Sequence, residues 1–412
     1  MAETNSKKYF HGISLSVLSM GVSLGINLIT YPLFLKTLPE KEFIAWFSTF
    51  EISQLFLLLD IGFTQGFIRN CSGSNINHIK SEFAVLRGSL RIMALLAFLV
   101  QMPIYCFTSG VAEIESIIPY ALLAASVTVT IASYSETAAL RVLLDFKSIY
   151  IANIAASIVF GLVIYLAKEF GVIAIAAGCL IRSMVQSVMQ KVMLPPRIQV
   201  SPIYIFKFDA TGTTLLMNSS YFFIFAFDSV LFNKFGILPR DISTYMIHRK
   251  LFDVFRGVND AILNVIAVRL ASSVSTKILA MGIGGTILGA IISFIFVPVA
   301  FKFLFGQSVL QISLTLILTC VACCTSLFRF AQIWCFMARI PKVIIKLFLF
   351  VILAKFAAAV SLFLYTSIVM FYCVQILFFV PILIWSYRLI VSRTIAANIF
   401  SSDVSCKRGV KE

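Results

Sequence analysis

Four of the charged residues between positions 249 and 260 recur at helical spacing. Each lies three or four residues from the next, and the set comprises Arg249, Asp253, Arg256 and Asp260. On a helix that turns roughly 100° per residue, they fall within about 60° of one another and form one narrow stripe. A helix in an apolar environment cannot turn such a stripe toward lipid. We therefore expect the stripe to face other helices or a polar cavity.

Two interpretations fit this stripe. In the first it is one wall of a cavity, where guanidinium groups bind a diphosphate through paired hydrogen bonds and carboxylates exchange hydrogen bonds with sugar hydroxyls. In the second, the pairs Arg249–Asp253 and Arg256–Asp260 neutralise each other and only hold helices together. We favour the cavity, because helix association in a membrane needs far fewer charges.

Other ionisable residues also lie within apolar segments, where each costs about 2.5–3.5 kcal/mol on insertion scales and marks a cavity or a partner. The cavity candidates that join the stripe are Lys250, Glu51, Arg182, Arg329 and Lys355. The gate or ion-coupling candidates are Asp60, Asp228 and Asp260. For Asp60 and Asp260, a structural role at a helix end is equally compatible with the position. Asp228 lies deep enough to pair within its own half, and a lysine such as Lys355 can also reach a membrane interface.

The elements that hold these charges belong to a membrane protein. The chain has 412 residues, of which 60% are hydrophobic and 12% charged, and its mean hydropathy is +0.99. Soluble domains carry about 25% charged residues, enough to cover their surface. The composition therefore excludes a disordered protein, a disulfide-rich secreted module and a cytosolic enzyme. It also explains the net charge of +15 without a nucleic-acid partner, because the basic residues gather in short loops.

The hydropathy pattern predicts an all-α fold with twelve membrane-spanning helices, since about 20 apolar residues cross a bilayer. The expected spans are 13–35, 43–67, 83–107, 117–140, 148–167, 171–190, 211–233, 242–268, 278–301, 309–337, 343–366 and 370–391. Most of the 33 Lys and Arg residues then lie in loops on the side of the N-terminus. The positive-inside rule therefore places both termini in the cytoplasm. The polar stretch from 392 is expected to be a cytoplasmic tail.

The chain carries an internal repeat at an offset of 200 residues. The matching positions are Leu38-Pro39 with Leu238-Pro239, Asp60 with Asp260, and Arg69 with Arg269. An even number of helices in each half makes the two halves parallel repeats about an axis along the membrane normal. We expect two six-helix lobes, 1–200 and 201–412, joined by a proline-containing tether over 191–208.

Several of these segments resemble the Wzx-type O-antigen flippases. The similar residues are Asn27-Leu28-Ile29-Thr30-Tyr31-Pro32-Leu33-Phe34, Leu38-Pro39-Glu40-Lys41-Glu42-Phe43, Leu58-Leu59-Asp60-Ile61-Gly62 with Arg69, and Asp228-Ser229-Val230-Leu231-Phe232 with Tyr245. These flippases form the polysaccharide-transporter branch of the multidrug/oligosaccharidyl-lipid/polysaccharide exporter (MOP) superfamily. The family usually has Gly where this chain has Phe43, and Trp46 supplies its following aromatic residue. The residue-level likeness is confined to spans 1–2 and 7–8.

The resemblance implies a function in polysaccharide biosynthesis. Proteins of this branch move undecaprenyl-diphosphate-linked oligosaccharide units of the lipopolysaccharide O-antigen type across the bacterial inner membrane by alternating access. They need no cofactor, and H⁺ or Na⁺ coupling is compatible with a buried carboxylate. The partners it implies are the lipid-linked glycan, a polysaccharide polymerase and a chain-length regulator. Because most intramembrane cations lie in the second half, we expect the diphosphate to bind nearer that half.

Two other classes remain as alternatives. A multidrug antiporter of the same superfamily would bind cationic compounds, which Glu51 and Asp60 allow but the basic residues of 242–268 oppose. A membrane enzyme is the weakest alternative, because the predicted external loops are short. No metal site is expected, since the three histidines lack ligand spacing and Cys320-x-x-Cys323 has no second pair.

Overall fold

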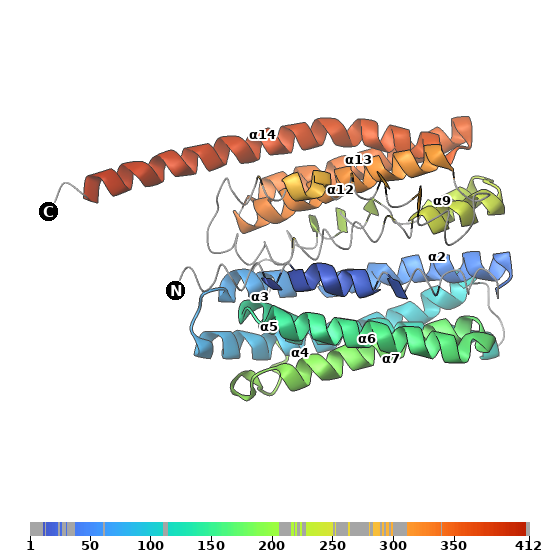
Figure 1. The fold of residues 1–412 in the computed structure, drawn as a ribbon, viewed down its shortest axis with the longest axis horizontal. Coiled ribbons are helices and arrows are strands. Elements are labelled where there is room, and N and C mark those ends of the chain that lie inside the picture. The colour runs from blue at the N-terminus through green and yellow to red at the C-terminus, as the bar shows by residue number, and fades with distance from the viewer. Residues whose placement is uncertain are drawn as a thin grey trace.

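The computed structural model is helical wherever it describes regular structure, and the described residues contain no β-strand. These residues are 11–12, 14–23, 25–26, 30, 38–60, 62–109, 114–205, 216–217, 219–220, 223–224, 228–249, 252, 263, 280, 283–288, 291, 294–295, 298–299, 311–338 and 340–408. Figure 1 shows the helices lying side by side along one direction, as in a bundle that spans a membrane. Of the predicted spans, 1, 7, 8 and 9 fall partly or mostly outside the described residues.

Seven described helices are long and apolar enough to cross a membrane. Four lie in the first half of the chain: α4 (Ile76–Ser109), α5 (Ile114–Val142), α6 (Phe146–Ala167) and α7 (Val172–Met193). Three lie in the second half: α12 (Ile312–Met337), α13 (Pro341–Tyr365) and α14 (Ile368–Arg408). Each overlaps one predicted span, and most of the helix ends lie within a few residues of the predicted ends. A long apolar run is a strong signal for a membrane helix.

The last helix extends beyond its predicted membrane span. Its apolar part, Ile368–Ser392, matches the predicted span 370–391, and α14 then continues through the predicted polar tail to Arg408. Figure 1 shows its C-terminal part projecting well beyond the other helices. Hydropathy identifies only the apolar part of a helix. The backbone hydrogen bonds do not require apolar side chains, so the helix can continue into a polar segment.

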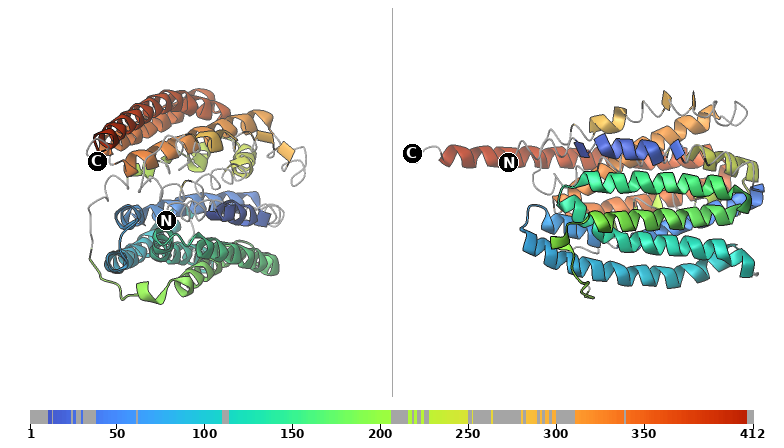
Figure 2. Two further views of the ribbon diagram at one scale, coloured as in Figure 1. Left: turned by 60° about the vertical axis from the view of Figure 1, so that its left-hand side comes forward. Right: turned by 60° about the horizontal axis from the view of Figure 1, so that its bottom comes forward.

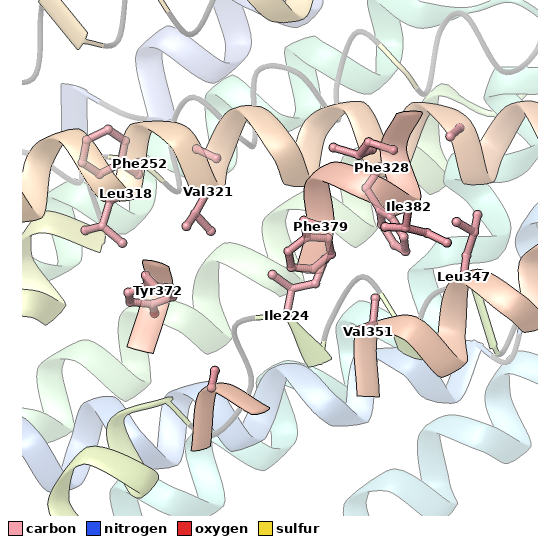
Figure 3. Packing of buried hydrophobic residues seen from close by; sticks show 14 of the residues in the cluster. Ile224, Phe252, Leu318, Val321, Phe328, Leu347, Val351, Tyr372, Phe379 and Ile382 are labelled. Carbon is pink, nitrogen blue, oxygen red and sulfur yellow. The ribbon is translucent and has the colours of Figure 1, made fainter. Parts of the chain in front are cut away.

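The helices form two layers (Figure 2), and each layer has its own apolar core. One core joins α4, α5, α6 and α7, where α5 packs against both α4 and α7. The other joins α12, α13, α14 and the short α9 (Asp228–Lys234), and Figure 3 shows Phe328, Phe379, Ile224 and Tyr372 among its side chains. The division of the chain into lobes over 1–200 and 201–412 stays a prediction.

Helix α2 (Glu40–Phe56) lies between the two layers (Figure 1). Its side chains Trp46 and Ile52 belong to the core of the first half, whereas Phe43 and Phe47 belong to the core of the second. One helix of the first half therefore contributes to the packing of both.

Span 2, predicted as one helix over 43–67, is interrupted. Helix α2 ends at Phe56, a 3₁₀ turn covers Leu57–Asp60, and α3 (Phe63–Cys71) begins after Gly62, whose φ is +79°. Glycine adopts this left-handed conformation without the steric cost that a Cβ brings. The Asp60 carboxylate accepts hydrogen bonds from the Thr64 backbone N–H at 3.0 Å and from its hydroxyl at 2.7 Å, and so satisfies the start of α3.

The repeat is visible at the first of its three matching positions. Pro39 precedes α2 and Pro239 opens the helical stretch over 239–249, so each proline lies at the start of a helix. Proline suits the first turn of a helix because the missing N–H would have no partner there. Of the other two pairs, Asp260 and Arg269 lie outside the described residues.

The segment after α7 is fixed to α4. The Ile203 N–H donates to the Ala84 carbonyl at 2.8 Å, and the Ser89 hydroxyl donates to the Ile205 carbonyl at 2.8 Å. Arg87 donates to the Val200 carbonyl at 3.0 Å. These bonds hold residues 200–205, which lie in the second half of the predicted tether, against the side of the helix. A Cβ at Gly88 would collide with the Ile203 carbonyl oxygen, so only glycine permits this approach.

Gly88→Ala should release the tether from α4. The new methyl group displaces backbone rather than a flexible side chain, so the hydrogen bonds of residues 200–205 are lost. We expect faster tryptic cleavage after the exposed Arg197, measured by limited proteolysis of the purified protein in detergent. Gly284→Ala is the matched control, because a Cβ there meets nothing within 4 Å. Unchanged cleavage in both variants would contradict the proposed packing.

Candidate functional site

The Asp228 carboxylate is fully buried at the start of α9, where three side chains from other elements contact it. Lys355 of α13 forms an ion pair with its Oδ1. Tyr372 of α14 donates a hydrogen bond to Oδ2, and Tyr245 of the 239–249 helix donates to the same oxygen at 3.1 Å. The two tyrosine hydroxyls are also 2.5 Å apart. One carboxylate thereby links four helical elements of the second half.

The Lys355 ammonium has three kinds of partner. Besides Asp228, it donates to the Ile224 carbonyl at 3.0 Å and lies 5.1 Å from the ring centroid of Phe371. Gln375 donates to the same carbonyl at 2.9 Å. The lysine therefore points into the second half and does not extend to a membrane interface, which was the alternative left open by the sequence.

A second ion pair joins the two halves of the chain. Arg249 contacts Oε1 of Glu51 in α2, and the Ser229 hydroxyl donates to Oε2 of the same carboxylate at 2.6 Å. The Ser48 hydroxyl, one turn earlier on α2, donates to Ser229 at 3.4 Å. Since α2 begins at Glu40, Glu51 lies about 16 Å along the helix, roughly half of a 30 Å hydrocarbon core.

The two ion pairs are connected. Arg249 donates to the Tyr245 hydroxyl at 3.3 Å, and Tyr245 donates to Asp228. We call this connected set the inter-lobe polar network; its residues are Ser48, Glu51, Asp228, Ser229, Tyr245, Arg249, Lys355 and Tyr372. Phe232 packs edge-on against Tyr245 and Phe371, at 5.1 Å in each case, and helps to keep the network dry. Its two acids balance its two bases, so a buried cluster of four charges has no net charge.

The structure brings together four of the candidates named from the sequence: Glu51, Asp228, Arg249 and Lys355. Asp228 pairs within its own half, as anticipated. The sequence predicts that Arg249 pairs with Asp253 or faces a cavity; the structure shows a contact with Glu51, and Asp253 lies outside the described residues. The remaining stripe candidates, Lys250, Asp253, Arg256 and Asp260, lie outside the described residues.

Three further candidates lie among the described residues. The Arg182 guanidinium lies over the Phe160 ring of α6 at 5.6 Å, within the first half. Arg329 is half-buried in α12. Asp60 accepts the hydrogen bonds that start α3, which favours the structural role that its position allowed. No group of three His, Cys, Asp or Glu side chains among the described residues is arranged to hold a metal ion.

Sequence reasoning missed several members of the network. Ser229 and Tyr245 stood in the quoted motif but without a role, and Ser48 and Tyr372 were not singled out. A hydroxyl in an apolar segment is a weak signal, because it can also bond to its own helix. Tyr372 lies 144 residues from Asp228, so no local spacing relates the two.

Comparison with known structures identifies the fold. No family model matches the chain, and neither does any curated protein. Among solved structures, a MATE in complex with MaL6 has a TM-score of 0.69 and 13% identity, over 92% of this chain and 96% of that one. The Vibrio cholerae MATE transporter VcmN in its bent form has a TM-score of 0.68 and 13% identity, over 97% of this chain and 100% of that one.

The chain has the fold of the MATE transporters. That fold contains twelve membrane helices in two lobes, which confirms the predicted all-α class and its two-lobed arrangement. Identities of 12–15% establish the fold and nothing finer. The inter-lobe polar network therefore joins the two lobes of a MATE fold, with Glu51 on one lobe and Arg249 on the other.

Asp228→Asn and Lys355→Met should each destabilise the protein more than expected from their volumes. Each variant leaves one buried charge without its countercharge, which costs about 3–5 kcal/mol. The double variant removes both charges and should lose clearly less than the sum of the two single variants. The measurement is the free energy of unfolding in mixed micelles, with the exposed Glu42→Gln as control. Additive losses would show that the pair contributes no coupling.

Proposed function

We propose that the chain is an alternating-access transporter of the MOP superfamily. The observation that carries this proposal is the buried Glu51–Arg249 pair at the contact between the lobes. An ion pair in a dry interior is a poor source of stability, because the desolvation of both charges offsets their attraction. Such a pair is readily understood where the lobes separate in a second state and both side chains regain water.

A second contact between the lobes lies near the C-terminal end of span 2. The Arg69 guanidinium, near the end of α3, lies over the Phe336 ring of α12 at 4.9 Å. In the proposed topology this end of α3 faces the cytoplasm and the start of α2 faces the periplasm. Rocking of one lobe against the other would break one of these contacts before the other, and so expose the interior to one side at a time.

One candidate substrate class is the cationic compounds of a multidrug antiporter. The fold shared with MATE transporters favours it. The argument against this class was that the basic residues of 242–268 repel a cation. The charge balance of the network weakens this argument, since Arg249 is paired with Glu51. On this proposal, Glu51 or Asp228 would bind the cation or a coupling proton after its basic partner moved away.

The second candidate is an undecaprenyl-diphosphate-linked oligosaccharide. The observation in its favour is the location of the residues that resemble those of the Wzx-type flippases. Asp228, Ser229 and Tyr245 are members of the inter-lobe polar network, and Asp60 and Gly62 form the break in span 2. The resemblance therefore rests on residues with particular geometric roles rather than on general membrane composition. In this case the protein acts in the inner membrane beside a polysaccharide polymerase and a chain-length regulator.

Cysteine cross-linking tests alternating access for either substrate. Ser48→Cys and Ser229→Cys place two thiols where two hydroxyls are 3.4 Å apart across the lobes. In a background with the nine native cysteines replaced, oxidation should form a disulfide and stop transport, and reduction should restore it. Each single variant under the same oxidant is the control. Full transport by the cross-linked protein would contradict the proposal.

Deletion of the gene in its host separates the two substrate classes. We expect a flippase to leave single lipid-linked units on the cytoplasmic side and to remove the surface glycan. A multidrug antiporter would leave the glycan intact and change the sensitivity to cationic compounds. Units that reach the surface unpolymerised would indicate an assembly enzyme and contradict both. The measurement is the surface polysaccharide together with the undecaprenyl-diphosphate-linked units in each leaflet.

A further inference from the structure

We propose that an anionic phospholipid of the cytoplasmic leaflet binds where the tether crosses α4 and fixes residues 200–205 to the membrane. On this proposal the lipid phosphate contacts a cation of α4, and three tether side chains lie in the interface of the bilayer. These residues form what we call the tether–lipid site: Arg91, Ile203, Tyr204 and Ile205. The inference goes beyond the proposed function, because it does not depend on which substrate the protein transports.

One face of α4 carries the tether, then a cation, then an apolar side chain. The residues of this face are spaced four, three and four apart, within about 60° of one another, and they are Ala84, Gly88, Arg91 and Leu95. The tether contacts the first two positions, because its Ile203 N–H donates to the Ala84 carbonyl and its backbone passes over Gly88. Arg91 and Leu95 therefore follow directly beyond the tether.

Leu95 marks the level at which α4 begins to present an apolar surface. It is 59% exposed, and Leu99, one turn further on, is equally exposed. Over the earlier part of α4, from 76 to 94, no large apolar side chain is exposed. An exposed apolar surface on a membrane helix contacts acyl chains. Arg91 lies one turn before Leu95, about 6 Å along the helix axis, and so at the level of the lipid headgroups.

Arg91 is available to an external anion. It is exposed, and no hydrogen bond or ion pair engages it within the part of the chain that the structure describes. Side chains of a helix point back toward its N-terminus, so Arg91 extends toward the level of the tether and away from the acyl chains. Arg87, one turn earlier, differs because it is paired with Glu136 and donates to the Val200 carbonyl.

The tether supplies apolar side chains at the same level. Ile203, Tyr204 and Ile205 are 44%, 60% and 57% exposed, although hydrogen bonds to Ala84 and Ser89 hold their backbone against α4. A contiguous set of exposed apolar side chains indicates a contact surface, and tyrosine is enriched at the interface between membrane and water. Insertion of these side chains into the interface removes them from water.

Charge favours an anionic lipid over a zwitterionic one. Residues 191–205 contain two basic residues, Lys191 and Arg197, both exposed, and no acidic residue. Arg197 belongs to the 3₁₀ turn Pro196–Ile198, which contacts α4. In the predicted topology this end of α4 faces the cytoplasm, whose leaflet carries anionic lipids. Each Lys or Arg near such a surface strengthens binding roughly fivefold.

Tryptic cleavage after Arg197 tests whether a lipid fixes the tether. The full-length protein is placed in nanodiscs of dioleoylphosphatidylcholine, alone or mixed with dioleoylphosphatidylglycerol. We expect phosphatidylglycerol to slow cleavage of the unaltered protein roughly fivefold, and Arg91→Gln to lose this effect. Arg91→Lys should keep most of it, because an ammonium group also binds phosphate. Arg240→Gln is the matched control, since it removes an equally exposed cation at the start of the 239–249 helix.

Native mass spectrometry in detergent measures the binding itself. The unaltered protein and Arg240→Gln should retain phosphatidylglycerol at roughly fivefold lower lipid concentration than Arg91→Gln does. Equal slowing of cleavage in Arg91→Gln would overturn the inference, because it would reveal a general effect of surface charge. Slowing by inorganic phosphate in phosphatidylcholine nanodiscs would assign the site to a free anion and overturn it as well.

These measurements separate the inference from the proposed function, because neither involves transport. A protein that binds phosphatidylglycerol through Arg91 but transports neither substrate class would support the tether–lipid site and contradict the proposed function. A protein that transports and whose tether is cleaved at the same rate with and without phosphatidylglycerol would do the reverse.

Discussion

A carboxylate in the interior of a membrane protein requires a countercharge, and this requirement accounts for much of the arrangement between the lobes. Asp228 is buried completely and is balanced by Lys355, which must therefore reach it from α13. Glu51 is balanced by Arg249, which must reach it from the other lobe. The positions of α2, α9, α13 and the 239–249 helix relative to one another are restrained by these two pairs, because a shift of a few ångströms would leave a charge unpaired in a dry medium.

The sequence predicts the membrane helices well and their interruptions poorly. Seven spans could be placed within a few residues, since hydropathy integrates over about 20 positions. The break in span 2 escaped for the same reason: Leu57–Leu59 are apolar, so the average over the segment stays high although the helix ends. Gly62 and the spacing of Asp60 and Thr64 were the available signals. A left-handed glycine and a capping carboxylate act over four or five residues, which is shorter than a hydropathy window resolves.

The candidate residues could be named from sequence, but their partners could not. Helical spacing relates Arg249 to Asp253, four residues on, and this local pair was the natural alternative to a cavity. The partner found is Glu51, 198 residues away. The partners of Asp228 are equally remote, at 17, 127 and 144 residues. Local periodicity predicts which face a residue takes on its own helix. It carries no information on which helix packs against that face, because tertiary packing decides that.

The connection between the two ion pairs has a consequence for how the lobes communicate. The Tyr245 hydroxyl accepts a hydrogen bond from Arg249 and donates one to Asp228, so it is bonded to one member of each ion pair. If a second state separated Glu51 from Arg249, the positive charge of Arg249 would lose this countercharge and act more strongly on Asp228 through Tyr245. The ion pair between Asp228 and Lys355 would then weaken. Such coupling would carry a change at the contact between the lobes to α13 and α14 through charge and hydrogen bonds.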